Sequence, residues 1–252
     1  MSTDERRVAL VSGASYGLGA AIARGLAQDG FDVAVTELDP GDLAETIAAI
    51  EGAGVRGLAV ELDLRSNDSI VSAVDTVLEG FGRIDLLVNN AGMLLVGSAL
   101  DVTPDEFDTI MRTNVTGTFL MSQAVARHML GLGREGQIIN LASTFTTVGS
   151  PGVAPYGISK TAIGGVTRHL AAEWGPQGVR VNAVAPGTSE TKLRAEVMAA
   201  DPERRESGIA KIPLGRFTEP EDVAGAVSYL ASPAAAYVNG HILAVDGGMT
   251  VT

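Results

Sequence analysis

The stretch RVALVSGASYGLGAAIARGLAQDG, residues 7–30, joins a short apolar run to a helical pattern through a loop rich in glycine. The run at 7–13 is continuously apolar rather than alternating, which is typical of a strand buried on both faces. The pattern at 15–30 predicts a helix that ends at Gly30. Because a buried strand followed by a helix is the unit of a parallel sheet covered by helices, this stretch predicts an α/β fold.

The alternation of strand and helix continues along all 252 residues of the chain. Seven buried strands with regular crossovers predict a doubly wound, seven-stranded parallel sheet with helices on both faces, in a single domain that spans residues 1–252. After the first strand and helix, we expect strands at 31–37, 55–63, 83–92, 136–143, 178–187 and 240–248, and helices at 41–54, 67–82, 104–130, 155–174 and 219–231.

Composition narrows the possible partners and locations. The net charge of −12 repels phosphate groups, so we expect no nucleic-acid partner and no anionic membrane surface. The absence of Cys excludes disulfides and thiolate chemistry. The apolar run from Val8 to Val11 is too short for a signal-peptide core, and no run approaches the length of a membrane span. We therefore expect a cytoplasmic protein.

The glycine loop has the spacing G-x-x-x-G-x-G, formed by Gly13, Gly17 and Gly19. Glycine allows a tight turn and a close approach of the backbone to a pyrophosphate at the helix N-terminus, although such a loop can also serve packing alone. Glu37 ends the second expected strand, where a carboxylate can accept hydrogen bonds from ribose hydroxyls and repel a 2′-phosphate. No Lys or Arg lies in the loop or directly after Glu37, which favours NAD over NADP.

A second pattern, PYGISKTAIGG at 155–165, places Tyr156 and Lys160 four residues apart. On a helix this spacing puts both side chains on one face. Taken alone, such a pair is most often a half-exposed phenol beside a solvated ammonium. A cation next to a phenol also favours its ionised form, which brings a proton donor closer to working pH.

Together these motifs resemble the short-chain dehydrogenase/reductase family, over nearly the whole chain. The resemblance rests on five motifs in order: SGASYGLG (12–19), NNAG (89–92), Asn114 in TNVTG, Ser143 followed thirteen residues later by Tyr156 and then Lys160, and PGTSET (186–191). The departures are small, since Ser12 replaces the usual Thr and Glu37 the usual Asp. The resemblance implies a Rossmann fold and an NAD-dependent oxidoreductase that interconverts a secondary alcohol and a ketone.

The resemblance also implies the roles of particular residues. Tyr156 would be the general acid/base, Lys160 would hold the nicotinamide ribose, Ser143 would bond the substrate oxygen, and Asn114 would hold a water on a proton path. The implied cofactor-binding residues are Gly13, Ser15, Tyr16, Gly17, Leu18, Gly19, Glu37, Asp63, Leu64, Asn90, Ala91, Gly92, Tyr156, Lys160, Pro186, Gly187, Thr188 and Thr191. Asp85 and Asn89 would be structural, with hydrogen bonds at the ends of their strand.

A polar excursion at about 187–218 is expected to form a lid over the substrate site. The expected substrate contacts are Met93, Ser143, Phe145, Tyr156, Ser189 and Arg194. The C-terminal segment resembles both sugar-acid or polyol dehydrogenases and 3-oxoacyl-carrier-protein reductases. Because Glu37 opposes NADPH, a sugar, sugar acid or polyol ranks first as substrate. A scaffold or sensor that binds NAD without turnover, or a structural protein that kept the fold, remains the alternative of another class.

Two further expectations concern metals and assembly. His128, His169 and His241 have no ligand-like neighbours in the sequence, so no metal is expected. The resemblance implies a homotetramer, with one interface from the helices at about 104–130 and 154–174 and another from the last helix and strand.

Overall fold

The structure is a computed structural model that describes residues 6–189 and 202–251. The structure confirms a single parallel sheet of seven strands, and their order, which was not predicted, is β3-β2-β1-β4-β5-β6-β7. The strands are β1 (Val8–Ser12), β2 (Asp32–Glu37), β3 (Gly57–Glu61), β4 (Leu86–Asn89), β5 (Gly136–Leu141), β6 (Val179–Pro186) and β7 (Ile242–Val245). The order reverses between β1 and β4, and in sheets of this type the ligand crevice lies at that reversal.

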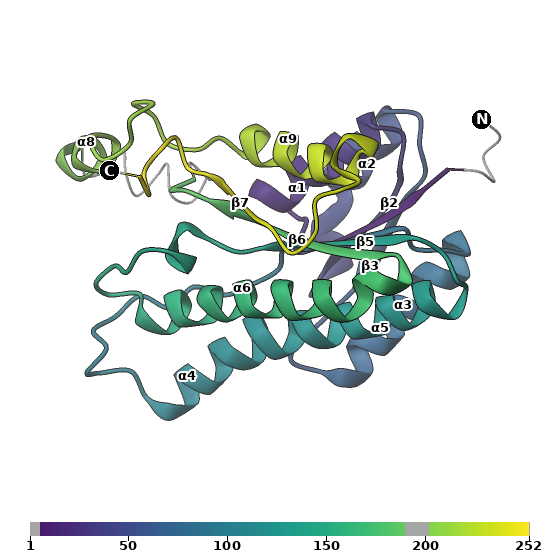
Figure 1. Cartoon of the computed structure of the whole chain (residues 1–252), viewed down its shortest axis with the longest axis horizontal. Coiled ribbons are helices and arrows are strands. Elements are labelled where there is room, and N and C mark those ends of the chain that lie inside the picture. The colour runs from purple at the N-terminus through teal and green to yellow at the C-terminus, as the bar shows by residue number, and fades with distance from the viewer. Residues whose placement is uncertain (1–5, 190–201, 252) are drawn as a thin grey trace.

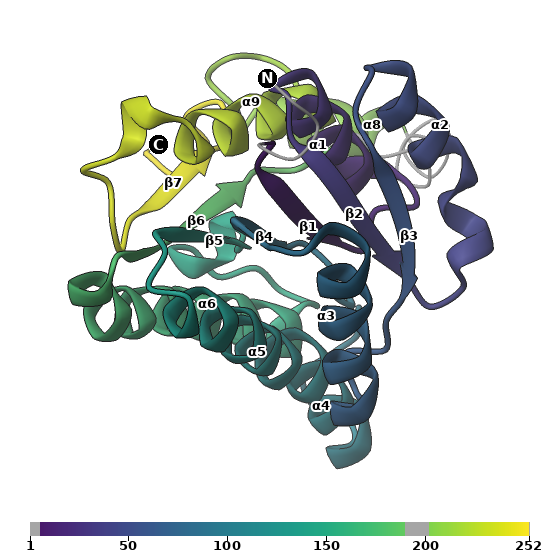
Figure 2. The same cartoon turned by 90° about the vertical axis from the view of Figure 1, so that its right-hand side faces the viewer.

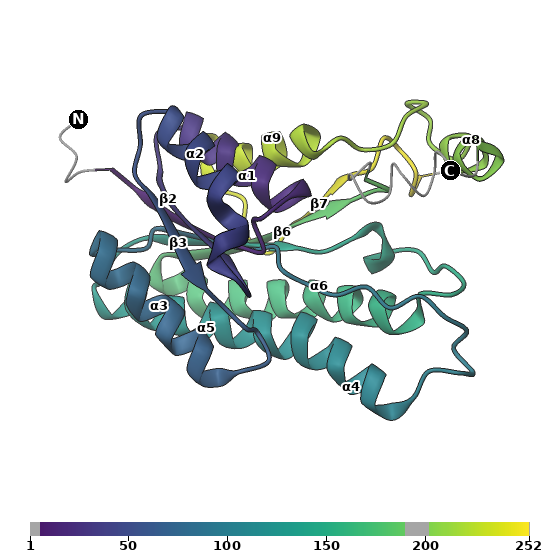
Figure 3. The ribbon, with the colours of Figure 1, turned by 180° about the vertical axis from the view of Figure 1, so that it is seen from behind.

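Helices cover both faces of the sheet (Figures 1 and 2). One layer contains α1, α2 and α9, and the other contains α3, α5 and α6 with α4 beside them (Figure 3). The helices are α1 (Gly17–Gln28), α2 (Ala44–Gly52), α3 (Asn67–Phe81), α4 (Pro104–Met111), α5 (Thr118–Gly131), α6 (Ala154–Trp174), α8 (Pro202–Ile209) and α9 (Pro220–Ala231). The prediction of a doubly wound α/β fold is therefore confirmed.

The sheet has a hydrophobic core on each face, because successive strand residues point in opposite directions. In β1, Ala9 and Val11 pack in the core under α1 and α9, whereas Val8 and Leu10 pack in the core over α3 and α5. All five residues of β1 are buried, which explains why the strand reads as a continuous apolar run.

The helix expected at 104–130 begins where predicted but is not continuous. Its capping box is present: Thr103 Oγ1 accepts from Glu106 N, and the Glu106 carboxylate accepts from Thr103 N at 2.9 Å. A π-helical segment, η3 (Arg112–Gly117), then separates α4 from α5. π-Helical turns often occur at functional sites, and this one carries Asn114.

The polar excursion after β6 is joined at its base. Thr218 N donates to Thr188 O at 2.9 Å, and Ser189 and Thr218 form an isolated parallel bridge. The short helix α8 lies within the excursion, and the sequence patterns did not predict it. The segment after β7 approaches the same region, since Leu214 N donates to Gly247 O at 3.1 Å. No helix in the described parts of the chain is long and apolar enough to cross a bilayer.

Candidate active site

The carboxyl ends of the central strands bring the predicted site residues to one edge of the sheet. The glycine loop follows β1, Asn90 to Gly92 follow β4, Ser143 follows β5, and Pro186 ends β6. In open parallel sheets this edge is where ligands bind.

The glycine loop packs tightly against the residues after β4. A Cβ on Gly19 would lie 2.1 Å from Gly13 O and 2.5 Å from Asn90 Nδ2, and one on Gly13 would lie 2.8 Å from Ala91 Cα. Asn90 Nδ2 donates to Gly13 O at 2.7 Å. Glycine is therefore required for packing within the protein as well as for the turn, where Gly13 has a φ of +66°.

The start of α1 fits an anionic group. Helix α1 begins at Gly17, and the side chain of its N-cap residue Tyr16 forms no capping hydrogen bond. The first N–H groups of a helix lack partners within the helix and carry its positive dipole end. With a glycine loop leading into it, this terminus is suited to the pyrophosphate of a dinucleotide.

The hydroxyl of Ser12 has a role that the motif alone did not reveal. It accepts hydrogen bonds from Asn90 N and Ala91 N, both at 3.1 Å, and Ser12 is buried. The hydroxyl therefore joins the ends of β1 and β4 at the point where the strand order reverses. The only signal in the sequence was that Ser12 keeps the hydroxyl of the Thr usual in the family.

The end of β2 lies against the glycine loop. Gly13 N and Ala14 N both donate to Thr36 O, at 2.9 and 3.2 Å. Ser15 Oγ donates to Glu37 Oε2 at 2.7 Å, and Leu38 N donates to Glu37 Oε1 at 3.1 Å. Glu37 is thus held beside the loop, as a ribose-binding carboxylate would need to be.

The expected adenine side contains a carboxylate that is already paired. Asp63 accepts hydrogen bonds from Arg65 N, Nε and Nη2 at 2.9 to 3.0 Å. The Arg65 guanidinium lowers the pKa of Asp63, so this acceptor stays ionised. Leu64 packs against Gly117, where a Cβ would lie 2.7 Å from Leu64 Cβ. The sequence analysis did not include Arg65 in the site.

Tyr156 and Lys160 lie on one face of α6, as the spacing predicted. Lys160 Nζ is 5.6 Å from the centre of the Tyr156 ring, and it donates to Leu141 O at 2.7 Å. The Phe145 ring meets the Tyr156 ring edge-on, with ring centroids 6.0 Å apart and ring planes at 89°. Lys160 is buried, with 6% of its surface exposed, and this burial lowers its pKa from 10.5 to about 8.

Asn114 connects the loop after β4 to α6. Its Oδ1 accepts from Met93 N at 2.7 Å, and its Nδ2 donates to Met93 O at 2.9 Å and to Ser159 Oγ at 3.0 Å. A Cβ on Gly92 would lie 3.1 Å from Asn114 Oδ1 and 3.7 Å from Lys160 Nζ. The structure therefore brings Asn114, Lys160 and Gly92 together, and the sequence did not predict the contacts with Met93 and Ser159.

Ser143 lies just beyond β5 and is almost fully buried. Its hydroxyl accepts from Phe145 N at 3.3 Å, and its carbonyl accepts from Thr146 N and Thr146 Oγ1 at 2.9 and 2.8 Å. These bonds shape a single 3₁₀ turn (Thr144–Thr146). The turn places Phe145 against Tyr156.

The segment expected at the nicotinamide side lies between β7 and the base of the excursion. Gly187 N donates to Val245 O at 2.9 Å, and a Cβ on Gly187 would lie 2.9 Å from Asp246 Cα. Pro186, Thr188 and Ser189 continue this segment. Thr191 and Arg194, which the sequence analysis also assigned to the site, lie outside the described residues.

Hydrogen bonds from polar side chains connect the central strands to one another and to the helices α5 and α6. Asn89 Nδ2 donates to Ser122 Oγ and to Asn140 Oδ1, both at 2.9 Å, and Asn140 Nδ2 donates to Thr167 Oγ1 at 3.0 Å. Asp85 Oδ2 accepts from Val8 N at 2.8 Å. The hydrogen bonds expected of Asp85 and Asn89 at the ends of their strand are confirmed. The series of side-chain hydrogen bonds that runs from α5 through β4 and β5 to α6 was not predicted from the sequence.

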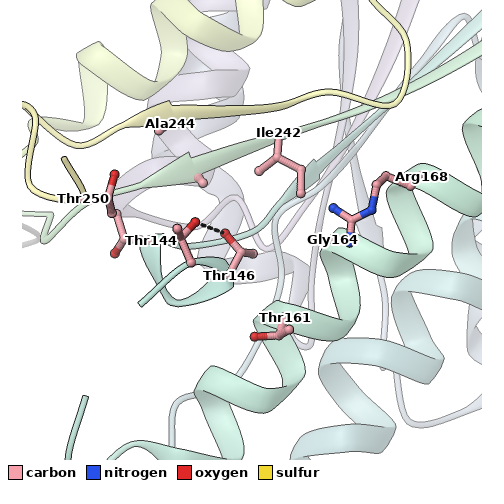
Figure 4. A pocket seen from close by; sticks show the side chains of 10 residues that line it. Thr144, Thr146, Thr161, Gly164, Arg168, Ile242, Ala244 and Thr250 are labelled. Carbon is pink, nitrogen blue, oxygen red and sulfur yellow. Dashed lines mark hydrogen bonds between the residues drawn. The ribbon is translucent and has the colours of Figure 1, made fainter. Parts of the chain in front are cut away.

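A cavity of about 170 Å³ lies beside the Ser143 turn, between α6 and β7 (Figure 4). Its floor is apolar, with Ile242 and Ala244 from β7. The hydroxyl-bearing residues around it are Thr144, Thr146, Thr147, Thr161 and Thr250, and the remaining lining residues are Gly164 and Arg168 on α6 and Ala185 on β6.

Within residues 6–189 and 202–251, no three His, Asp or Glu side chains gather closely enough to hold a metal ion. That no metal is needed stays a prediction.

Comparison with known proteins defines the class. A family model described as enoyl-(acyl carrier protein) reductase matches residues 13–250. The chain is 41% identical to 2-dehydro-3-deoxy-D-gluconate 5-dehydrogenase of Escherichia coli over 245 residues, which cover 97% of this chain and 95% of the relative. It is 40% identical to the 3-oxoacyl-[acyl-carrier-protein] reductase FabG of Vibrio cholerae over 245 residues, 97% of this chain and 98% of the relative.

Solved structures agree with this assignment. A putative 2-deoxy-D-gluconate 3-dehydrogenase from Agrobacterium tumefaciens, solved with bound NADP, superposes with a TM-score of 0.90 at 37% identity and covers 98% of this chain and 97% of its own. The chain belongs to the short-chain dehydrogenase/reductase family. It is an oxidoreductase, and the resemblance inferred from the motifs is confirmed.

Proposed function

We propose that the enzyme interconverts a secondary alcohol and a ketone with NAD(H), and that its substrate is a sugar, a sugar acid or a polyol. The observation that carries the proposal is the pairing of Tyr156 with the buried Lys160 at the carboxyl edge of the sheet. The nicotinamide ring, when bound, supplies or accepts the hydride. The protein orients the substrate and moves the proton.

Tyr156 is the general acid/base in this proposal. A pKa of about 8 leaves Lys160 charged near neutral pH, and its ammonium favours the phenolate form of the neighbouring ring. In oxidation the phenolate takes the hydroxyl proton of the substrate, and in reduction the phenol returns a proton to the carbonyl oxygen. In the same proposal, Ser143 hydrogen-bonds that oxygen and stabilises the charge that develops on it.

Asn114 completes the proton path in the proposal. A carbonyl oxygen can accept two hydrogen bonds, and Asn114 Oδ1 takes one from Met93 N. The second lone pair can hold a water that leads from Lys160 toward solvent. The contacts of Asn114 with Met93 and Ser159 keep that oxygen beside Gly92 and Lys160.

Local charge supports NAD as the cofactor. Glu37, Asp39 and Asp42 are the charged side chains within 36–43, and the glycine loop at 13–19 has no charged side chain at all. A 2′-phosphate at this position would meet these carboxylates and no cation from either segment, whereas ribose hydroxyls can donate to Glu37. NADP is the competing cofactor because a structural neighbour was solved with NADP bound.

The substrate assignment rests on the relatives and on the expected lid at 187–218. One relative is a sugar-acid dehydrogenase, and the carboxylate of a sugar acid could pair with Arg194, the cation expected at the lid. The FabG relative favours a second candidate, reduction of a 3-oxoacyl thioester. A scaffold or sensor that binds NAD without turnover is the alternative of another class.

We also propose a homotetramer. Strand β7 ends the sheet, so one of its edges is free for pairing in the described parts of the chain. Phe119 on α5 and Ile158 on α6 are exposed apolar side chains on the helices expected at the other interface. Light scattering coupled to size exclusion measures the mass directly, and a monomer in solution would contradict this part of the proposal.

A substrate panel tests the function. Formation of NADH or NADPH is followed with sugars, sugar acids, polyols and secondary alcohols, and consumption of each is followed with 3-oxoacyl thioesters. We expect NAD-linked turnover of one sugar-type class. Activity on thioesters with NADPH would instead support the second candidate. NAD binding by calorimetry without turnover on any class would favour the sensor.

A further inference from the structure

Ser15 and Glu37 form a side-chain contact between the glycine loop and the end of β2. Their hydrogen bond, from Ser15 Oγ to Glu37 Oε2, is 2.7 Å long and joins residues 22 positions apart. It is a bond from a hydroxyl to a carboxylate, a kind stronger than that between two neutral groups. The bond therefore restrains the carboxylate on which the proposed choice of NAD depends.

Glu37 needs such a restraint. A Glu side chain has one more rotatable bond than the Asp usual in the family, so its carboxylate can occupy more positions. The second oxygen, Oε1, accepts from Leu38 N at 3.1 Å. With Oε1 bonded to backbone and Oε2 to Ser15, both oxygens have a fixed direction, and each keeps a lone pair for a ribose hydroxyl.

Ser15 is itself held firmly enough to act as the restraint. The two residues before it donate through Gly13 N and Ala14 N to Thr36 O at 2.9 and 3.2 Å. The buried Thr46 Oγ1 donates to Ala14 O at 2.8 Å. These bonds tie the backbone on the N-terminal side of Ser15 to β2 and α2, so the hydroxyl stays beside Glu37.

We propose that Ser15 is a positioning residue that sets the preference for NAD over NADP by fixing the Glu37 carboxylate. This inference rests on the proposed choice of NAD. Without the hydroxyl, the carboxylate gains freedom to turn away from the ribose. NAD then loses well-oriented acceptors, and a 2′-phosphate meets less repulsion.

The experiment measures dissociation constants of NAD and NADP by calorimetry, which needs no substrate. Ser15→Ala should weaken NAD binding by about three- to tenfold, the range for one charge-assisted hydrogen bond partly replaced by water. The variant should also bring the dissociation constants of NAD and NADP closer together, which narrows the NAD/NADP ratio. Ser15→Thr keeps the hydroxyl and should restore most of the ratio. Unchanged melting temperatures would show that the loop remains folded.

The double variant separates positioning from direct contact with the cofactor. If Ser15 acts through Glu37, Ser15→Ala should change the ratio little in a Glu37→Gln background. Equal effects of Ser15→Ala in both backgrounds would mean that Ser15 contacts the cofactor itself and would overturn the inference.

Failure of the proposed cofactor choice has a different signature. An NAD/NADP ratio unchanged by Glu37→Gln would refute the choice of NAD through Glu37. A ratio that responds to Glu37→Gln but not to Ser15→Ala would leave that choice standing and overturn only the role of Ser15.

Discussion

The ammonium nitrogen of Lys160 lies 5.6 Å from the centre of the Tyr156 ring, one helical turn away on α6. The same nitrogen donates to Leu141 O at 2.7 Å, so the carboxyl end of β5 holds the cation beside the phenol. Burial makes this arrangement costly for the charged form and lowers the pKa of Lys160 to about 8. A buried cation with a lowered pKa beside a phenol is typical of sites that exchange protons, in keeping with the proposed mechanism.

Replacing Tyr156 by Phe should lower kcat by about a hundred- to ten-thousandfold, the usual contribution of a general acid/base. The ring and its edge-on contact with Phe145 would remain, so NAD affinity and folding should change little. Steady-state kinetics and calorimetry measure the two quantities. Tyr229→Phe, on the surface of α9, is the matched control and should keep full activity. A normal kcat in Tyr156→Phe would remove Tyr156 from its proposed role.

Lys160 should give the unfolding free energy a distinct pH dependence. Its pKa is about 8 in the folded chain and 10.5 when exposed, so between these values the unfolded chain binds the extra proton and stability rises with pH. At about 1.4 kcal/mol per unit, the gain across this window is about 3 kcal/mol. Lys160→Met should lack this rise.

Urea unfolding of the wild type and of Lys160→Met, each near neutral pH and near pH ~10, gives the rise in unfolding free energy for each protein. Subtracting one rise from the other removes the contribution of all other titrating groups and leaves that of Lys160. Lys211→Met removes an exposed ammonium and should follow the wild type. Identical pH slopes for wild type and Lys160→Met would show that Lys160 keeps an ordinary pKa.

Two glycines of α1 should respond oppositely to Ala. In Gly19→Ala the Cβ would lie 2.1 Å from Gly13 O, so the loop must shift, and we expect a loss of about 3 kcal/mol or more together with weaker NAD binding. In Gly25→Ala the nearest atom, Ala224 Cβ, is 3.5 Å away, an ordinary contact. That variant should be neutral or gain up to about 1 kcal/mol from helix propensity. Equal stability of the two variants would contradict the close packing of the loop on Asn90.

Removal of metal should leave activity unchanged. The described residues form no cluster suited to a metal ion, and the proposed chemistry uses a phenol, an ammonium and a hydroxyl. Dialysis against a chelator followed by kinetic assay tests this expectation. An activity that disappears with the chelator and returns on addition of a divalent cation would require a metal in the enzyme.

Local patterns in the sequence predicted the strands, most helices and the pairing of Tyr156 with Lys160. These features depend on residues close in the chain, where the periods of strand and helix decide which side chains share a face. The π-helical segment carrying Asn114 escaped prediction, because apolar periodicity indicates a helix over 104–130 without showing which carbonyl each N–H bonds. Helix α8 was also missed, since it lies in a polar stretch without an apolar stripe.

By itself, the sequence determined the fold class, the family and the residue types available for catalysis, since these follow from local periodicity and from motif spacing. Only the tertiary structure decided which distant groups meet: Ser15 with Glu37, Lys160 with Leu141 O, and Asn114 with Met93 and Ser159. Those contacts depend on strand order, with β4 inserted beside β1 and Ser12 joining them. Strand order is set by packing across the whole chain, which no local pattern contains.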